Sequence, residues 1–304
     1  MQLALAPMQD VTDAAFLRVL FKLGSVPDVL ITPYLRSTDT TCAMSEGPLR
    51  FIDENPTGVP VWAQLAGSDA APLVRDARRL MADYPIAGIN LNAGCPSPLV
   101  NRHGAGAALL RDLPRLRSVC LALRDALPAG HFSIKCRLGW ESPDEFSSVL
   151  AVLMEAQPDM LIVHGRTRRQ LYRGTPRKQE VATAVRCMSC PVLANGDICS
   201  VSDAAEWVNA THPAGLMIGR GAVGNPYIYR MLRGGPPPSR AEMQSYFDAL
   251  LEETASVLKV YTPAGHCNRM KKYLTFCYAE HFSPEEEYAL RRCTDPAAMR
   301  QIWR

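Results

Sequence analysis

The chain has 304 residues, of which 47% are hydrophobic and 21% are charged, and its formal net charge is +3 at pH 7. This composition is typical of a globular protein with a sizeable core, and the weak positive charge permits a polyanionic partner without requiring one. No run of about 18 apolar residues occurs, which argues against a transmembrane helix. The N-terminal sequence MQLALAPMQDVTD lacks the basic segment of a signal peptide. We therefore expect a cytoplasmic, monomeric protein with no membrane partner.

Eight apolar runs of strand length alternate with amphipathic stretches along the first 235 residues. Continuous runs of Val, Ile, Leu and Ala are expected of parallel strands that are buried on both faces. The number of alternations predicts a (β/α)₈ TIM barrel, whereas a doubly wound sheet, the second candidate, usually has about six strands. The predicted strands are Leu3–Met8, Val29–Tyr34, Val59–Leu65, Ala87–Asn92, Phe132–Leu138, Met160–Gly165, Pro191–Asn195 and Gly215–Gly219.

Most of the intervening segments have the hydrophobic spacing of helices that cover such a barrel. The clearest of these predicted helices are Ala71–Ala82, Leu116–Leu127, Phe146–Ala156 and Asp203–Val208.

A break in the pattern follows the eighth strand. Gly234–Pro238 has the sequence GGPPP, which cannot continue a helix, and Ser239 behind it is a candidate N-cap. The remaining sequence has helical patterns and no convincing strand. We therefore predict a barrel domain over residues 1–235 and a small helical domain over residues 240–304.

Distinctive polar residues stand at the ends of nearly all predicted strands, where a TIM barrel has its active site. Lys135 alone could be a solvated strand end, and His164 alone could be a structural histidine. Their recurrence at one end of the barrel favours a functional site. Asn195-Gly196-Asp197 and Gly219-Arg220 follow strands seven and eight, which is the usual phosphate site of this fold. The residues therefore predict a phosphorylated ligand in the barrel mouth, near Cys95.

The ten cysteines have no disulfide-framework spacing, and in a reducing compartment most are expected to be small buried residues. Cys187 and Cys190 form a CxxC motif without a second pair or clustered histidines. This motif is better explained by a junction between a helix and a strand than by zinc, and no metal site is predicted.

A set of motifs in fixed order resembles the tRNA-dihydrouridine synthase family along essentially the whole chain. The matching segments are AlaProMet (6–8), ValThrAsp (11–13), Gln64, AsnAlaGlyCysPro (92–96), GlyAlaGlyAlaAlaLeuLeu (104–110), IleLysCysArgLeuGlyTrp (134–140), HisGlyArgThr (164–167), AlaAsnGlyAsp (194–197) and MetIleGlyArgGlyAla (217–222). TyrLeuArg (34–36) and the tail sequence ArgMetLysLysTyrLeu (269–274) favour the subgroup that acts on a D-loop uridine.

The resemblance implies a flavin-dependent, NADPH-driven reduction of the C5=C6 bond of a uridine in tRNA, with Cys95 as the proton donor. A thiol of ordinary pKa is protonated at neutral pH and suits that role. The resemblance also implies FMN, bound by Pro7, Met8, Gln9, Gln64, Lys135, His164, Asn195, Gly196, Asp197, Gly219 and Arg220. The RNA contacts that it implies are Arg36, Asn92, Arg173, Arg269, Lys271 and Lys272.

Three positions depart from the family pattern. Pro33 stands where glutamate is common, Asn90 where aspartate is common, and Leu99 where lysine is usual. The basic run from Arg269 is also consistent with a solvated helix face, and helical spacing places Arg269 with Lys272 and not with Lys271.

Three other functions fit parts of the pattern. A dihydroorotate-dehydrogenase-like flavoprotein would act on a free pyrimidine, but it would not need the helical tail. A class I aldolase would use Lys135 as a Schiff base, and a non-catalytic RNA-binding paralogue would not need Cys95, Lys135 and His164 together.

Overall fold

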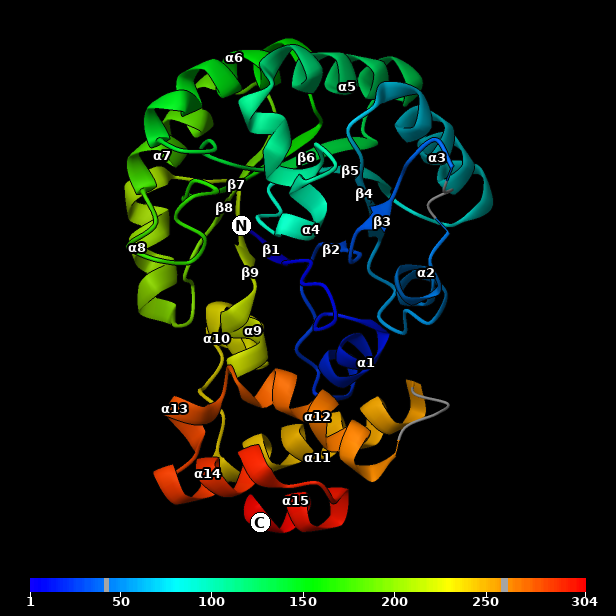
Figure 1. The fold of residues 1–304 in the computed structure, drawn as a ribbon. Helices are drawn as coiled ribbons and strands as arrows, with labels where there is room; N and C mark the ends of the chain where they lie inside the picture. The colour runs from blue at the N-terminus through cyan, green and yellow to red at the C-terminus, as the bar shows by residue number, and fades with distance from the viewer. Residues whose placement is uncertain (41–43, 258–261) are drawn as a thin grey trace.

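The computed structural model describes residues 1–40, 44–257 and 262–304 (Figure 1). Its parallel strands form a barrel, with helices outside them and a helical region beside the N-terminal helix. One of the ten cysteines, Cys42, lies outside the described residues. The strands are β1 (Gln2–Leu5), β2 (Leu30–Ile31), β3 (Leu35–Arg36), β4 (Val61–Ala66), β5 (Gly88–Ala93), β6 (Phe132–Arg137), β7 (Met160–His164), β8 (Val192–Asn195) and β9 (Gly215–Ile218).

The sheet closes on itself. Its strands follow the order β1-β9-β8-β7-β6-β5-β4-β2, all in parallel register. The gap between the two ends is bridged by Ala4 and Val29, and the Leu5 N–H donates to the Val29 carbonyl at 3.0 Å. A doubly wound sheet would leave two free edges, so the predicted TIM barrel is confirmed.

Two strands differ from their predicted bounds by more than two residues, whereas the other six differ by one or two. The second is split into β2 and β3, which both pair with β4, because Pro33 lies between them and has no N–H to donate to the ladder. The first ends at Leu5 and not at Met8. There the chain turns inward, since the Met8 N–H donates to Thr12 Oγ1 at 2.8 Å instead of to a neighbouring strand.

The outer helices bury one face each. In α3, for example, Leu73, Ala77 and Leu80 recur at helical spacing and are fully buried. The four clearest predicted helices are all present as α3, α5, α6 and α8. The barrel helices are α1 (Ala14–Lys22), α2 (Glu46–Asp53), α3 (Ala70–Asp83), α4 (Pro98–Asn101), α5 (Leu113–Ala126), α6 (Phe146–Ala156), α7 (Lys178–Cys187), α8 (Val201–Thr211), α9 (Arg220–Gly224) and α10 (Ile228–Leu232), with short 3₁₀ turns at Gly106–Arg111 and Pro143–Glu145.

The barrel separates two hydrophobic cores. Along β7, Met160 and Ile162 face the barrel interior, whereas Leu161 and Val163 pack against the outer helices. This alternation follows from the two-residue period of a strand. The interior cluster fills the floor of the barrel and leaves its opposite end to polar side chains.

The described residues of the C-terminal region form helices joined by short turns, with no strand. Ser239 caps its first helix as predicted, because the Glu242 N–H donates to Ser239 Oγ at 3.2 Å and the Glu242 carboxylate accepts from the Ser239 N–H. Helix α11 packs against α1, and α12 packs against α9. The helices are α11 (Arg240–Val257), α12 (Pro263–Leu274), α13 (Tyr278–His281), α14 (Pro284–Arg292) and α15 (Pro296–Ile302).

The buried floor of the barrel gives a prediction for stability. Replacing Ile162 with alanine should lower the free energy of unfolding by about 2–5 kcal/mol, because it removes buried methyl groups and leaves a cavity. Met154→Ala on α6, at a side chain that is 46% exposed, should change it by no more than about 0.5 kcal/mol. Urea unfolding followed by circular dichroism measures both, and equal effects would contradict this description of the core.

Candidate active site

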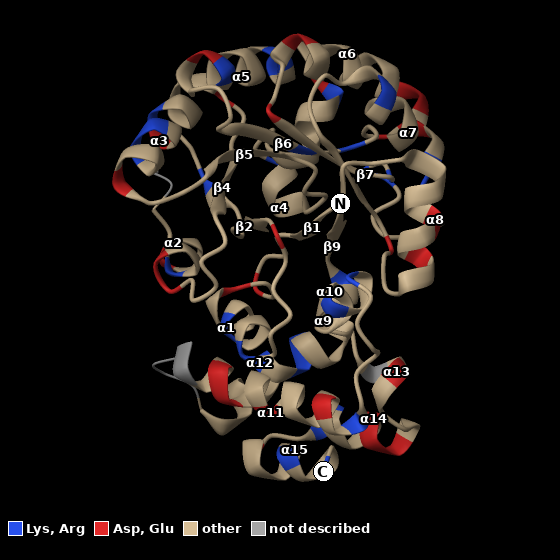
Figure 2. Cartoon of the chain, turned by 180° about the vertical axis from the view of Figure 1, so that it is seen from behind, with Lys and Arg blue, Asp and Glu red and all other residues tan. Residues whose placement is uncertain are grey.

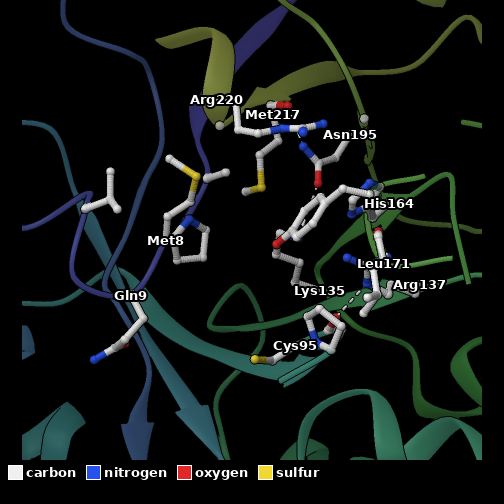
Figure 3. A pocket seen from close by; sticks show the side chains of 18 of the residues that line it. Met8, Gln9, Cys95, Lys135, Arg137, His164, Leu171, Asn195, Met217 and Arg220 are labelled. Carbon is white, nitrogen blue, oxygen red and sulfur yellow. Dashed lines mark hydrogen bonds between the residues drawn. The ribbon is translucent and has the colours of Figure 1, made fainter. Parts of the chain in front are cut away.

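A cavity of about 610 Å³ opens where the strands end. Figure 3 shows Cys95 and Arg220 at opposite sides of it, with Lys135 between them. Each residue that was predicted to act in catalysis or to bind the cofactor lines this cavity. These residues are Pro7, Met8, Gln9, Gln64, Cys95, Lys135, His164, Asn195, Gly196, Asp197, Gly219 and Arg220.

Two asparagine side chains fix the loop that carries Cys95. Asn92 Oδ1 accepts from the backbone N–H groups of Gly94, at 3.1 Å, and Cys95, at 2.9 Å. Asn101 Nδ2 donates to the Cys95 carbonyl at 2.9 Å. Gly106 has a φ of +64°, and a Cβ there would lie 2.9 Å from the same carbonyl oxygen. The loop is therefore held by hydrogen bonds to both the N–H and the carbonyl of Cys95, and only a glycine at position 106 leaves room for that carbonyl.

The Cys95 thiol is kept in its protonated form. Partial burial raises its pKa, and this effect outweighs the hydrogen bond from the Ser97 backbone and the nearby charges of Lys135 and Arg137, which lower it. A protonated thiol is a poor nucleophile but can donate a proton. The environment of Cys95 thus suits a general acid.

A chain of amide hydrogen bonds crosses the barrel interior beneath this loop. Gln64 Nε2 donates to Asn90 Oδ1 at 2.7 Å, and Asn90 Nδ2 donates to Ser133 Oγ at 2.9 Å. Asn92 Nδ2 donates to Gln64 Oε1 at 2.9 Å. An aspartate at position 90 could accept but not donate. Asn90 therefore fits a neutral network in which each amide both accepts and donates.

Lys135 reaches into the cavity from β6. Its Nζ donates to Asn195 Oδ1 at 3.3 Å, and Asn195 in turn donates to the Met217 carbonyl at 2.8 Å. Burial, followed by the charge of Arg137, lowers the pKa of Lys135 to about 8. The ammonium group is still mostly protonated at neutral pH and supplies a positive charge to the cavity.

His164 lies beside this cation and is neutral. Burial lowers its pKa well below the ordinary value, and Arg137 and Lys135 lower it further. Its Nε2 is buried without a hydrogen-bond partner in the described part of the chain. Leaving such an atom unsatisfied costs about 1–3 kcal/mol, so this nitrogen marks a place where a ligand would form a hydrogen bond.

Asp197 lies between two arginines at the end of the cavity that was predicted to bind phosphate. Its carboxylate pairs with the buried Arg166 and with Arg220. Burial raises the pKa of Asp197, but the contacts with both arginines outweigh that effect and hold it below its usual range. The neighbouring Gly196 has a φ of +143°, and a Cβ there would lie 2.9 Å from Pro176.

Several residues of this site were not predicted from the sequence, among them Arg137, Arg166 and Tyr172. Arg137 is buried, and its guanidinium donates to the Gly94 carbonyl at 2.9 Å; it follows Lys135 by two residues, so strand alternation could have revealed it. Arg166 holds Asp197. Tyr172 is 54% exposed, lines the cavity and lies under the Arg220 guanidinium at 4.9 Å, but no local pattern distinguishes it from other loop aromatics.

The residues predicted to bind RNA do not form one group. Asn92 is buried in the cavity wall, where it holds the Cys95 loop. Arg36 lines a small hollow beside the cavity together with Tyr34 and Leu99, the last of which is 53% exposed. Arg173 is exposed in the loop after β7.

The remaining three lie on α12. Arg269 pairs with Asp13, and Lys272 lies 3.6 Å from the Asp10 carboxylate, so both face the barrel, as their helical spacing predicts. Lys271 bonds to Asn268 of its own helix at 3.3 Å.

The described residues contain no group of three or more metal-ligating His, Cys, Asp or Glu side chains. Cys187 ends α7 and Cys190 precedes β8, which places the CxxC motif at a helix-to-strand junction as predicted. None of the described helices is long and apolar enough to span a membrane.

Solved structures of similar architecture confirm the fold. The old yellow enzyme from Trypanosoma cruzi superposes with a TM-score of 0.56 at 9% identity, covering 83% of this chain and 93% of that enzyme.

Sequence comparisons are more specific. A probable tRNA-dihydrouridine synthase from Rhodobacter capsulatus is 31% identical, over 97% of this chain and 91% of that protein. The tRNA-dihydrouridine(16) synthase of Salmonella typhimurium is 30% identical, over 98% of this chain and 97% of that protein. A profile of the family described as dihydrouridine synthase matches residues 4–301. The chain therefore belongs to the dihydrouridine synthase family of flavin-dependent oxidoreductases.

Proposed function

We propose that this protein reduces a uridine of tRNA to 5,6-dihydrouridine, with FMN in the cavity and NADPH as the reductant. The observation that carries the proposal is the Cys95 thiol, held on a fixed loop in a cavity that also contains Lys135 and the unpartnered His164 Nε2. The names of the relatives support tRNA as the substrate.

The residues present fit FMN. The cavity volume lies within the range of about 300–1,000 Å³ that small-molecule sites occupy. His164 Nε2 and Lys135 would hold polar atoms of the ring system or the ribityl chain. Asn195, Gly219 and Arg220 would hold a single phosphate group. Gly219–Gly224 has the GxGxxG spacing of a dinucleotide fingerprint, but no strand follows it in the described residues, so the βαβ unit that such a fingerprint needs is missing.

When bound, the reduced flavin supplies a hydride to C6 of the uracil ring. The C5=C6 bond is conjugated with the C4 carbonyl, so the electron pair that is displaced needs a proton at C5. The Cys95 thiol donates that proton and recovers it from solvent. Asn92 and Asn101 keep the thiol-bearing loop in place during this transfer. Lys135 stabilises negative charge in the cavity.

A uridine must leave its stack to reach a cavity of this depth. Basic side chains near the mouth, such as Arg36 and Arg173, would hold the RNA backbone while residues 240–304 extend the binding surface. Because relatives at 30% identity are named tRNA-dihydrouridine(16) synthase, we propose a D-loop uridine as the target, with position 16 as the first candidate.

The cofactor is tested by the colour of the purified protein. The protein should be yellow, and extraction should release FMN and not FAD, because the proposed site offers hydrogen-bond donors for one phosphate. Absorbance spectra and mass spectrometry of the extract measure this. A colourless protein that takes up no added FMN would disprove the proposal.

The acid is tested by Cys95→Ala. This variant should bind FMN and oxidise NADPH like the wild type, yet form dihydrouridine about 10²–10⁴ times more slowly, because it lacks the proton donor. Mass spectrometry of unmodified tRNA transcripts after incubation measures the product and its position. Cys199→Ala is the matched control, since Cys199 also lines the cavity. A wild-type rate in Cys95→Ala would exclude Cys95 as the acid.

The RNA surface is tested by replacing Arg36, Arg173 and Lys271 together with alanine. Binding of tRNA should weaken, and the slope of log affinity against log salt should flatten by about 0.7–0.9 for each phosphate that is no longer neutralised. FMN content should not change. Filter binding at several salt concentrations gives the slope, with Arg186→Ala on α7 as the control. An unchanged slope would place the RNA on another surface.

A further inference from the structure

The loop between β1 and α1 forms one wall of the cavity. It contributes Pro7, Met8 and Gln9 to the lining. Thr12 folds it into a compact turn, because its Oγ1 accepts from the Met8 N–H at 2.8 Å and donates to the Ala6 carbonyl at 3.1 Å. The N–H groups of Val11 and Thr12 both donate to the Met8 carbonyl.

The outer edge of this loop is acidic. Asp10 has a φ of +60°, in the left-handed region that aspartate and asparagine enter more often than most residues other than glycine. Asp13 caps α1 by accepting from the Phe16 N–H at 3.1 Å. Each aspartate pairs with a basic side chain of α12 in the C-terminal region. Figure 2 shows acidic segments beside α1 and basic segments on the neighbouring α12.

Arg269 of α12 contacts this acidic edge of the loop. Its guanidinium donates to the Asp10 carbonyl and to the Asp13 carboxylate, and it lies 5.2 Å from the centre of the Tyr273 ring. The Tyr273 hydroxyl donates to the other carboxylate oxygen of Asp13 at 3.1 Å. The Arg269 side chain is only 10% exposed, so little of it is accessible to a phosphate.

The end of the same helix reaches the cavity itself. Phe276, two residues after α12 ends, is part of the cavity lining, and the Tyr273 ring stacks on Phe16 of α1 at 6.1 Å. Helix α12 therefore contacts the outer side of the loop that carries Pro7–Gln9, and the segment after the helix contributes Phe276 to the cavity that this loop lines.

We propose that Arg269 is a positioning residue of the active site, which holds the loop of residues 6–13 in the shape that binds the cofactor. The C-terminal region is then part of the cofactor site and not an RNA-binding module alone. This role differs from the RNA contact that the family resemblance implies for Arg269. The proposal rests on the proposed function only for the identity of the ligand.

Two variants in the full-length protein test the clamp, by which we mean the contacts of Arg269 with Asp10 and Asp13. Arg269→Gln removes the charge, whereas Asp13→Asn weakens the ion pair but keeps a side chain that caps helices well. In both, amide hydrogen exchange at Met8, Val11 and Thr12 should accelerate about tenfold or more in the absence of flavin. Exchange in the Cys95 loop should not change. Arg269→Lys should restore part of the protection.

The cofactor readout uses FMN titration followed by flavin fluorescence. The dissociation constant should rise about tenfold in Arg269→Gln and Asp13→Asn, which corresponds to about 1.4 kcal/mol. Arg300→Gln is the matched control, because Arg300 pairs with Asp248 inside the C-terminal region at 2.7 Å; it should change neither the loop exchange nor the FMN affinity.

Unchanged exchange at residues 6–13 in Arg269→Gln would overturn the proposal, and so would faster exchange with unchanged FMN affinity. If Arg269→Gln does not fold, Asp13→Asn and Arg269→Lys give the same measurements with a milder change. If Arg269→Gln accelerates exchange but the wild-type protein binds no FMN, the clamp is supported and the proposed function is disproved.

Discussion

A parallel bridge between Ala4 and Val29 closes the sheet, and the common mouth at which its strands end depends on that closure. With β1 bonded to β9 on its other side, all strands end around the same mouth. Pro7, which follows β1, and Tyr34, which follows β2 at the other end of the strand order, therefore line one cavity. In an open sheet the same strand ends would form a row, and the ends of its first and last strands would lie far apart.

The barrel interior is chemically divided. Its floor is apolar, whereas the mouth has amides on β4 and β5 and cations on β6. Arg137 is satisfied by backbone carbonyls, which are dipoles and carry no net charge. The positive charges of the mouth are therefore only partly neutralised. Burial lowers the pKa values of Lys135 and His164, these charges lower them further, and the remaining positive charge favours an anionic ligand.

Much of the fold and most of the cavity could be predicted from the sequence, because buried parallel strands are continuous apolar runs and polar residues at their ends are conspicuous. The end of the first strand at Leu5 could not, since a side-chain hydrogen bond decides it. The break at Pro33 could have been predicted, because proline has no N–H to donate to a strand ladder. Tyr172 could not be predicted, because its place depends on Arg220, which is distant in sequence. Helical spacing showed which face Arg269 shares with Lys272, but not that Asp13 would be its partner.

The carboxylate of Asp197 has a consequence for any anion that enters the far end of the cavity. Arg220 already has a counterion there, so the incoming group must compete for it, and binding becomes an exchange of partners. Arg166 is almost completely buried and pairs with Asp197 independently of Arg220. An anion that binds Arg220 therefore gains less electrostatic stabilisation than it would from two arginines without a carboxylate between them. Selection among anions then depends more on the shape of the backbone around Gly196 and Gly219 than on the electrostatic attraction of Arg220.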